Sequence, residues 1–419
     1  MDLFEYRDGT LYCEGVKVRD IAAEVGTPVY IYSRATIEHH YRRVEEAFSA
    51  TRPLICYSVK ANGNLAVLRL LKGLGAGFDV VSGGELYRAL KAGADPRKIV
   101  FAGVGKTDPE IRRALQAGIL MFNSESLEEV ENIDRIAAAV GRKAPVAIRV
   151  NPDIDPGTHT YITTGKAENK FGVDIAVAEE IAAEVSRMKH VELMGFHCHI
   201  GSQITDIEPY GFAVQRMLEL FQKCRESYPL EYLNIGGGFG VYYRGGEARP
   251  VREFADQIMP FVEASRCKLI LEPGRFIVGN AGVLVTEVQY VKASGAKRFV
   301  ICDAGMNDLM RPALYGAFHK IWPVEADAGP ERAAGDLPKA DVVGPVCESA
   351  DFFAKDRPLP PLERGDLVSI FTTGAYGFTM SNNYNSRPRP PEVLVEGNSR
   401  RLVRKREMYE DLIRGETAK

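Results

Sequence analysis

Eight short apolar runs separated by amphipathic stretches constrain this sequence more than any other feature. The amphipathic stretches, such as 65–74 and 127–140, carry apolar residues at helical spacing, and glycines such as Gly118 and Gly141 stand where those helices should end. Eight strands alternating with helices predict an α/β protein with a (β/α)8 barrel of the TIM type. A doubly wound open sheet is the alternative. The eight runs are 54–60, 78–82, 99–103, 120–123, 146–151, 195–200, 233–237 and 268–272.

The pattern changes after Arg275. From residue 276 on, short runs rich in Val, Ile, Tyr and Thr are punctuated by Gly, Pro and Asp, which predicts a mostly β domain. The N-terminal pieces 10–13 and 29–32 are too short to fold alone, so we expect them to join that sheet. The predicted strands of this sheet are 283–291, 298–303, 340–343, 367–371, 391–395 and 399–403.

We therefore expect a barrel domain at 28–275 and a β-rich domain formed by 1–27 and 276–419. The polar stretch 325–339 is expected to be a surface loop, and 407–419 a short charged helix or a frayed end.

Charge and cysteine content narrow the class of protein. The net charge of −3 gives no electrostatic reason to bind nucleic acid or an anionic membrane surface. No apolar run is long enough to span a bilayer, and the acidic N-terminus lacks the features of a secretory signal. The seven cysteines are scattered, odd in number and without a C-x-x-C pair, which indicates reduced thiols in a cytoplasmic protein.

Lys60 ends the first apolar run, directly before the turn 61–64. In a barrel the carboxyl ends of the strands line the site, so Lys60 should project into it. A partly desolvated lysine loses its proton more readily, and its free amine can attack an aldehyde. The alternative is a lysine that snorkels to water from a strand end without a chemical role.

Three consecutive glycines, Gly236, Gly237 and Gly238, follow the seventh run. Glycines let backbone N–H groups approach an anion closely, and the loop after the seventh barrel strand is a usual place for a phosphate. Arg275, after the eighth run, offers a forked, charged hydrogen bond to a phosphate or carboxylate. Taken alone, however, the glycine triplet also fits a simple tight turn.

His197 and His199 lie in the sixth run, on the same side of the strand if the strand is regular. A metal pair is one interpretation. The sequence has only seven histidines, and none lies near the ends of the seventh or eighth runs, where a metal-dependent barrel hydrolase would need further ligands. The alternative is that one imidazole stacks on a flat ligand while the other has a structural role.

Glu272 ends the eighth run, beside the predicted phosphate site. A buried carboxylate needs a partner, and a protonated pyridine nitrogen would serve. A reactive lysine, a phosphate cradle, a stacking histidine and a carboxylate for a pyridine together describe a site for pyridoxal 5'-phosphate.

Motifs along nearly the whole chain then resemble those of one family. The sequence is similar to the alanine-racemase-like, fold-type III pyridoxal phosphate decarboxylases and, within them, to the diaminopimelate decarboxylases. The resemblance implies decarboxylation of meso-2,6-diaminopimelate to L-lysine and CO2, the last step of lysine biosynthesis. The motifs that carry it are YSVKAN (57–62), FDVVSGGE (78–85), NKFG (169–172), FHCHIGSQ (196–203), GGG (236–238), EPGR (272–275), RPALY (311–315), CESAD (347–351) and GAYG (374–377).

The resemblance also implies a role for each matching residue. Lys60 would bind the cofactor aldehyde, and His199 would stack on its ring. Cys347 would be the proton donor, and family members are typically homodimers in which this cysteine and Glu348 reach the partner's pocket. The cofactor site implied is Lys60, Asp79, His199, Ser202, Gly236, Gly237, Gly238, Glu272, Pro273, Gly274, Arg275 and Tyr376. The substrate site implied is Arg275, Arg311, Tyr315, Glu348 and Tyr376.

Simpler interpretations exist for single residues. Cys347 could be a small buried hydrophobe, Glu348 a solvated charge, and Arg311 with Tyr315 an ordinary pair on a helix surface. We expect Asp79 and Arg149 to form an ion pair that shapes the site. Alternative functions are a decarboxylase for another or a carrier-bound amino acid, a catalytically silent homologue that binds partners, and a metallohydrolase.

Overall fold

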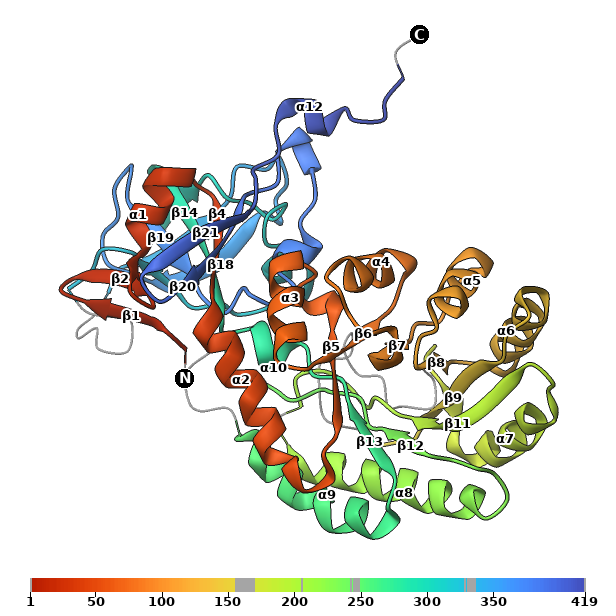
Figure 1. The fold of residues 1–419 in the computed structure, drawn as a ribbon. Coiled ribbons are helices and arrows are strands. Elements are labelled where there is room, and N and C mark those ends of the chain that lie inside the picture. The colour runs from red at the N-terminus through yellow and green to blue at the C-terminus, as the bar shows by residue number, and fades with distance from the viewer. Residues whose placement is uncertain are drawn as a thin grey trace. The chain divides into compact units, whose positions relative to one another are not determined.

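The computed structural model describes residues 2–154, 170–204, 206–241, 243, 249–327, 329 and 337–417. The chain forms two compact units. One comprises His40–Val241 and Glu247–Phe276, and the other comprises Met1–His39, Tyr242–Gly246 and Ile277–Lys419. Each unit contains its own β-sheet (Figure 1).

The first unit is a closed barrel of eight parallel strands. Each strand pairs with the next along the chain, and β13 pairs with β5 to close the cylinder, so the predicted barrel is confirmed and the open sheet is excluded. Each of the eight predicted runs overlaps one of these strands, although several strands begin or end outside the run. They are β5 (Leu54–Ser58), β6 (Gly77–Val80), β7 (Ile99–Phe101), β8 (Met121–Ser124), β9 (Ala144–Asn151), β11 (Val191–His197), β12 (Tyr232–Asn234) and β13 (Lys268–Leu271). The two-residue strand β10 (Val173–Asp174) pairs with β9 and was not predicted.

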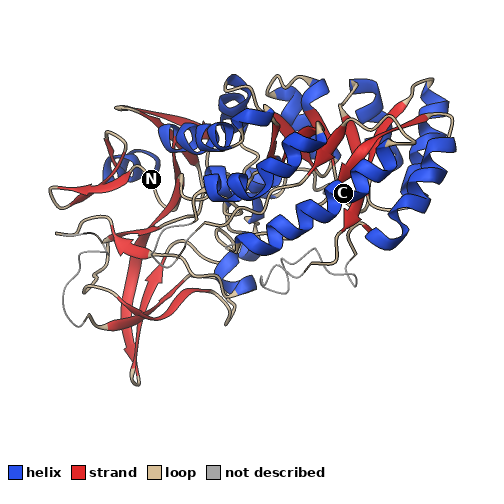
Figure 2. Ribbon diagram, turned by 90° about the horizontal axis from the view of Figure 1, so that it is seen from below, coloured by secondary structure: helices blue, strands red, loops and turns tan. Residues whose placement is uncertain are grey.

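Helices surround the barrel strands (Figure 2). They are α2 (Arg34–Ala47), α3 (Leu65–Gly73), α4 (Gly83–Lys91), α5 (Asp108–Ala117), α6 (Leu127–Val140), α7 (Ala178–Arg187), α8 (Ile207–Arg225), α9 (Val251–Ser265) and the short α10 (Arg275–Val278). Gly118 and Gly141 end α5 and α6 in the left-handed conformation, with φ of 71° and 65°. This confirms the predicted helix ends, because glycine adopts that conformation without steric cost. Short 3-10 helices include η1 (Ser49–Thr51), η2 (Val59–Ala61), η3 (Pro96–Lys98) and η5 (Ile175–Val177).

The second unit is built around the long strand β14 (Gly282–Ser294). Its main sheet has the order β18-β17-β15-β14-β4-β20-β21, and β19 also pairs with β14 and with β16. The other strands are β4 (Val29–Ser33), β15 (Lys297–Cys302), β16 (Ile321–Pro323), β17 (Lys339–Val343), β18 (Phe352–Pro358), β19 (Leu367–Ile370), β20 (Glu392–Glu396) and β21 (Ser399–Arg404). A small sheet of β1 (Phe4–Arg7), β2 (Thr10–Cys13) and β3 (Val16–Lys17) precedes α1 (Val18–Val25). The short helices of this unit are α11 (Arg311–Tyr315), η6 (Phe378–Met380), η7 (Tyr384–Ser386) and α12 (Tyr409–Leu412).

The N-terminal segment completes this sheet, as predicted. β4 pairs in antiparallel fashion with β14 and in parallel fashion with β20. It therefore belongs to the β-rich unit, whereas the boundary predicted from the sequence at residue 28 would have placed it in the barrel domain. The residues of β4 are all buried, which is typical of a central strand. The β14 residues with which β4 pairs lie more than 240 residues away in the chain, so its place in the fold could not be predicted from the local sequence. Part of the predicted loop 325–339, at residues 328 and 330–336, lies outside the described residues.

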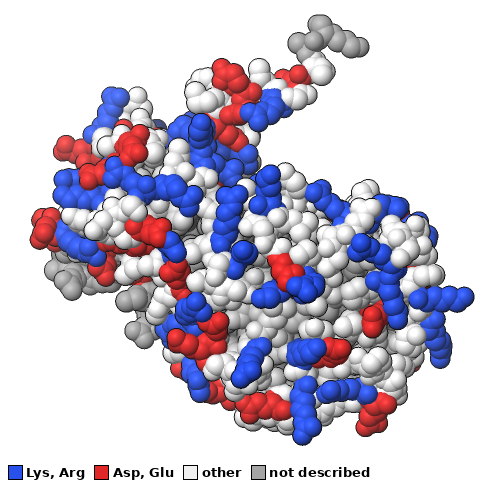
Figure 3. Space-filling model, viewed as in Figure 1, with Lys and Arg blue, Asp and Glu red and all other residues white. Residues whose placement is uncertain are grey.

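Strands β1, β3, β16 and β18 were not predicted from the sequence. β16 has only three residues and ends in a proline, while β18 contains the charged run Lys355-Asp356-Arg357, which hides its β character. On the molecular surface, basic and acidic side chains stand side by side over the barrel helices, in keeping with a net charge of −3 (Figure 3). Within the described ranges, the helices fall short of the length and apolarity needed to cross a bilayer.

Candidate active site

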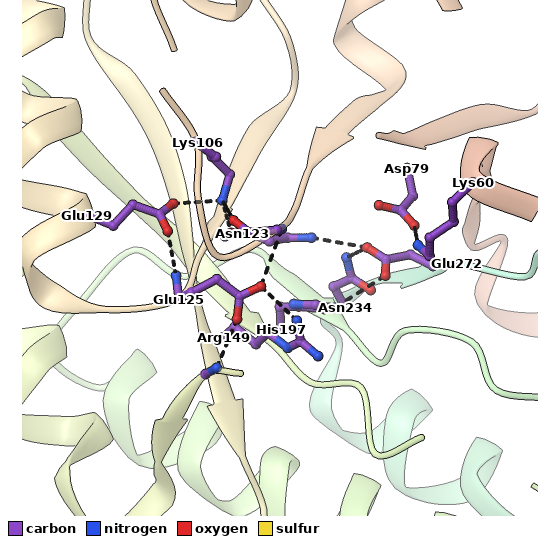
Figure 4. Close-up of polar contacts among 12 residues, drawn as sticks. Lys60, Asp79, Lys106, Asn123, Glu125, Glu129, Arg149, His197, Asn234 and Glu272 are labelled. Atoms are coloured by element: carbon purple, nitrogen blue, oxygen red, sulfur yellow. Dashed lines mark hydrogen bonds and ion pairs between the residues drawn. The ribbon is translucent and has the colours of Figure 1, made fainter. Parts of the chain in front are cut away.

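The carboxyl ends of the barrel strands carry a connected group of charged and amide side chains (Figure 4). Lys60 follows β5 in η2, and its ammonium group forms an ion pair with the carboxylate of Asp79 on β6. The Asp79 side chain is fully buried, whereas 37% of the Lys60 side chain is exposed. The lysine amine is therefore held at the mouth of the barrel by a buried carboxylate.

Asp79 lies in an unusual environment for a carboxylate. Burial raises its pKa, the nearby carboxylate of Glu272 raises it further, and Lys60 opposes both effects. Ser58 Oγ donates a 2.8 Å hydrogen bond to Asp79 Oδ2, while Oδ1 has no hydrogen-bond partner among the described residues. A carboxylate whose pKa is raised in this way is suited to accept a proton from the adjacent lysine.

Glu272, directly after β13, is buried and surrounded by donors. Asn123 Nδ2 on β8 and Asn234 Nδ2 on β12 both donate to its Oε1, over 3.1 Å and 2.6 Å. His197 Nε2, at the end of β11, lies 3.3 Å from its Oε2. Although burial opposes ionisation, His197, Lys60 and the amide of Asn234 hold the pKa of Glu272 well below its usual range. Glu272 is therefore a buried carboxylate that stays negatively charged at neutral pH.

The glycine triplet after β12 leaves no space for side chains. Gly236 and Gly238 have φ of 66° and 99°, in the left-handed region that favours glycine. A Cβ atom on Gly237 would lie 2.2 Å from the carbonyl oxygen of Glu272, and one on Gly238 would lie 2.4 Å from that of Gly201. The loop is thus a backbone surface in contact with the Gly201–Ser202 loop after β11, which fits a cradle for an anion.

The two histidines of the sixth strand have different surroundings. His197 faces Glu272, whereas His199 lies beyond the strand end, where its Nδ1 accepts a 3.3 Å hydrogen bond from the backbone N–H of Gly237. Burial lowers the pKa of His199 to about 3, and the cations Arg149 and Lys60 add to this effect. His199 is therefore neutral at physiological pH. In the part of the chain that the structure describes, no three His, Cys, Asp or Glu side chains are placed to hold a metal ion.

The predicted ion pair between Asp79 and Arg149 is wrong. Arg149 Nη1 on β9 donates to Glu125 Oε1 over 2.7 Å, whereas Asp79 pairs with Lys60. The reason is topological, because β6 and β9 are separated by β7 and β8 and each cation meets the carboxylate nearest to it. Glu125 also accepts a 2.8 Å hydrogen bond from the N–H of Gly172. In the predicted motif 169–172, Asn169 lies outside the described residues.

A buried lysine that the sequence analysis did not single out supports this group. Lys106 Nζ donates to Glu129 Oε1 over 2.7 Å and to the carbonyl oxygens of Gly103 and Asn123, each over 2.8 Å. Asn123 thus connects this network to Glu272 (Figure 4). Asn123 and Asn234 could have been recognised in the sequence, because each is a polar residue near the carboxyl end of a predicted buried strand.

Comparisons with known proteins identify the family of this chain. Residues 34–279 match the family model described as "Pyridoxal-dependent decarboxylase, pyridoxal binding domain". The diaminopimelate decarboxylase of Aquifex aeolicus is 48% identical over 98% of this chain and 96% of its own length. That of Pseudomonas aeruginosa is 49% identical over 100% of this chain and 99% of its own length.

This chain belongs to the diaminopimelate decarboxylase family. Among solved structures, the diaminopimelate decarboxylase from Helicobacter pylori complexed with L-lysine has a TM-score of 0.89 and 43% identity, covering 94% of this chain and 98% of that one. The enzyme from M. jannaschii in complex with L-lysine has a TM-score of 0.93 and 38% identity, covering 100% of this chain and 98% of that one. These findings confirm the family, the enzyme class and the pyridoxal-dependent chemistry predicted from the motifs.

Two predicted cofactor residues after Glu272 pack tightly against β5. The carbonyl oxygen of Pro273 accepts a 3.1 Å hydrogen bond from the N–H of Ser58, and a Cβ on Gly274 would lie 3.0 Å from the Ser58 Cβ. Arg275 follows as the first residue of α10 and is half-buried. Close packing of this turn fixes the direction in which the family's EPGR motif leaves the barrel.

The remaining predicted residues of the family site lie in the second unit. Arg311 begins α11 and is only 7% exposed, so it is not the ordinary helix-surface residue of the simpler interpretation; Tyr315, at the end of that helix, is half-buried. Tyr376 adopts a left-handed φ of 56° in a loop where Gly374 and Gly377 have no space for a Cβ. A strained non-glycine residue in a tight loop is typical of a functional position.

Cys347 and Glu348 are exposed on this unit. The N–H of Cys347 donates a 2.7 Å hydrogen bond to Asn385 Oδ1, and Glu348 Oε1 accepts a 3.3 Å hydrogen bond from the N–H of Ala350. Cys347 is thus not the buried hydrophobe of the simpler interpretation, and its thiol is accessible. The chemical roles of these residues stay predictions.

Proposed function

We propose that this chain catalyses the pyridoxal phosphate-dependent decarboxylation of meso-2,6-diaminopimelate to L-lysine and CO2, the last step of lysine biosynthesis. The observation that carries the proposal is the combination, at one barrel mouth, of the Lys60–Asp79 pair with the ionised Glu272 and the glycine cradle. Identity of 42–49% to diaminopimelate decarboxylases over nearly the full chain supports the substrate.

The residues at the barrel mouth fit this cofactor. Lys60 would bind the aldehyde, Gly236 to Gly238 with Ser202 would hold the phosphate, and the neutral ring of His199 would lie against the pyridine ring. Asp79 would take up the proton that the Lys60 amine must release before it reacts. When bound, pyridoxal phosphate supplies an electron-accepting ring for the charge left when a carboxylate departs as CO2.

Glu272 would control the charge of that ring. An ionised carboxylate beside a pyridine nitrogen holds a proton on the nitrogen, because the charged pair is favoured in a buried site. The two amides donate to Oε1 of Glu272 and His197 lies beside Oε2, so both carboxylate oxygens are held in place at the barrel mouth. Removal of Lys60 tests the whole assignment, since a Lys60→Ala protein that decarboxylates at the normal rate would refute it.

Selection among amino acids would rest on charge. Diaminopimelate carries both a carboxylate and an ammonium group at the end that does not react, and Arg275, Arg311 and Tyr315 would bind that carboxylate while Glu348 binds the ammonium. Lysine or ornithine offered as substrate would leave the guanidinium groups without an anion, at a cost of about 2–5 kcal/mol. Tyr376 would contact both cofactor and substrate, and Cys347 would deliver a proton to the reacting carbon.

A homodimer would complete the site. Cys347 and Glu348 are exposed on their own unit, and we propose that each reaches the pocket of a second copy of the chain. Mixing the inactive variants Lys60→Ala and Cys347→Ala tests this, because a shared site restores roughly a quarter of wild-type sites on random reassortment of subunits. No recovery after verified subunit exchange would contradict a shared site. The scattered thiols, all seven of them free, suit a cytoplasmic enzyme.

One assay decides the substrate. The purified holoenzyme is offered meso-, LL- and DD-diaminopimelate, lysine and ornithine, and released CO2 is followed. We expect turnover of the meso isomer alone. Faster turnover of lysine or ornithine would move the proposal to another amino acid, and bound cofactor without CO2 from any of the five would indicate a catalytically silent homologue.

A further inference from the structure

A buried histidine holds Arg311, one of the proposed substrate-binding residues. Nη1 of Arg311 lies 2.9 Å from His319 Nε2, and His319 Nδ1 lies 2.9 Å from the carbonyl oxygen of Phe371. His319 is fully buried, and Arg311 is 7% exposed. All of these groups belong to the second unit.

The two contacts of His319 determine its protonation state. A guanidinium group can only donate, so Nε2 of His319 must be the acceptor and carry no hydrogen. A carbonyl oxygen can only accept, so Nδ1 must carry the hydrogen. His319 is therefore the neutral tautomer with its proton on Nδ1, because a charged imidazolium would have no lone pair for Arg311.

The surroundings hold both side chains in place. The Arg311 guanidinium lies over the ring of Tyr243, 4.8 Å from its centroid, and the same ring meets His319 edge-on at 5.3 Å. Arg357 Nη1 donates a 2.7 Å hydrogen bond to the carbonyl oxygen of His319, which fixes the backbone there. The guanidinium of Arg311 is thus located by a hydrogen bond on one edge and by an aromatic face.

We infer that His319 is a positioning residue that aims Arg311 at the far carboxylate of the substrate. This inference rests on the proposed function, which assigns that carboxylate to Arg311. The choice of histidine has a physical reason. Unlike a carboxylate, a neutral acceptor such as His319 fixes the direction of the guanidinium group without cancelling its positive charge.

The test uses two half-mimics of histidine in the holoenzyme. In His319→Gln the amide oxygen takes the place of Nε2 and still accepts from Arg311, whereas in His319→Asn the amide nitrogen takes the place of Nδ1 and only the Phe371 contact is kept. We expect His319→Asn to raise KM for diaminopimelate about ten-fold with kcat changed less than about two-fold, as for one lost charged hydrogen bond. His319→Gln should restore most of the loss, and the control His190→Asn, at a half-exposed histidine of the barrel unit, should change nothing.

Binding of two amines separates positioning from general damage. Loss of one carboxyl group from diaminopimelate leaves L-lysine, whose own carboxylate is the former far carboxylate, while 1,5-diaminopentane has the same chain without it. Inhibition by L-lysine should weaken about ten-fold in His319→Asn, and inhibition by 1,5-diaminopentane should not change. Equal weakening of inhibition by both amines in His319→Asn would overturn the inference. So would unchanged inhibition of His319→Asn by L-lysine, if Arg311→Ala loses that inhibition. Unchanged inhibition in Arg311→Ala as well would instead refute the proposed role of Arg311.

A measurement on the unmodified protein guards against variants that fail to fold. Nitrogen-15 NMR of histidine-labelled holoenzyme distinguishes the two neutral tautomers and the imidazolium. We expect His319 to be neutral with its hydrogen on Nδ1 at pH 7.5, and a charged ring or a hydrogen on Nε2 would overturn the inference.

Discussion

Asn234 donates a 2.6 Å hydrogen bond to Oε1 of Glu272, the same oxygen that accepts a 3.1 Å hydrogen bond from Asn123. Two neutral donors on one oxygen stabilise the charge of a buried carboxylate without cancelling it. The second oxygen, Oε2, faces His197. The pair explains how the barrel keeps an anion in its interior, which is costly unless its lone pairs are matched.

Replacing Asn234 by alanine should therefore weaken the proposed control of the pyridine nitrogen. Loss of a hydrogen bond to a charged group costs about 1.5–3 kcal/mol, so we expect kcat to fall about ten-fold or more, with the cofactor still bound. The measurements are steady-state kinetics and the cofactor's absorbance. Asn132→Ala, which removes an exposed amide of α6, is the matched control. An Asn234→Ala enzyme with unchanged kcat would contradict this role of the amide.

Arg311→Ala should separate substrate binding from cofactor binding. We expect KM for diaminopimelate to rise by about a hundred-fold, because the far carboxylate loses a charge-assisted hydrogen bond, while cofactor occupancy stays at the wild-type level. Kinetics and absorbance on the same preparation give both quantities. Parallel loss of cofactor and of substrate affinity would argue that Arg311 supports the fold and does not bind substrate.

Glu85, the third residue of α4, should make the free energy of unfolding depend on pH. Burial raises its pKa to about 7, although a hydrogen bond from the N–H of Val81 and the charge of Lys60 oppose this. Between the ordinary pKa of a glutamate and about 7, the unfolded chain releases the Glu85 proton while the folded chain keeps it. The protonated side chain therefore contributes its full stabilisation at low pH, and the stability of the fold falls as the pH rises through this window.

The variant Glu85→Gln removes this titration and keeps an acceptor for Val81. We expect it to be more stable than the wild type at pH 8 by about 1–2 kcal/mol and equal to it at pH 4.5. Urea unfolding at the two pH values measures the difference, with Glu131→Gln at an exposed site of α6 as control. A stability difference that is the same at both pH values would show that Glu85 ionises normally in the folded protein.

Lys106 should be a structural requirement of the barrel. Its side chain is 1% exposed, burial lowers its pKa, and Glu129 opposes that effect. Lys106→Met would leave a buried carboxylate and two carbonyl groups unmatched, at a cost of about 3–5 kcal/mol in the free energy of unfolding. The double variant Lys106→Met, Glu129→Leu should recover part of this loss, and Lys223→Met, which breaks an exposed pair, should have little effect. A single variant as stable as the double one would disprove the coupling.

Much of the fold could be predicted from local pattern alone. Each of the eight apolar runs overlaps a barrel strand, and glycines such as Gly118 end the helices, because burial of one face and freedom of φ are properties of short segments. The position of Lys60 and Glu272 at the barrel mouth was also predictable, since each follows closely on a buried strand and such strand ends converge in a closed parallel barrel.

What only the tertiary structure decided is which side chains meet. Arg149 pairs with Glu125 and not with Asp79, Asn123 and Asn234 converge on one oxygen of Glu272, and His319 accepts from Arg311. The physical reason is that a sequence period reports which face of a strand or helix is buried, whereas a hydrogen bond depends on strand order and on ångström distances between segments far apart in the chain. The sequence alone determined the barrel and the charged residues at its strand ends, and the three-dimensional pairing decided which partner each of those residues meets.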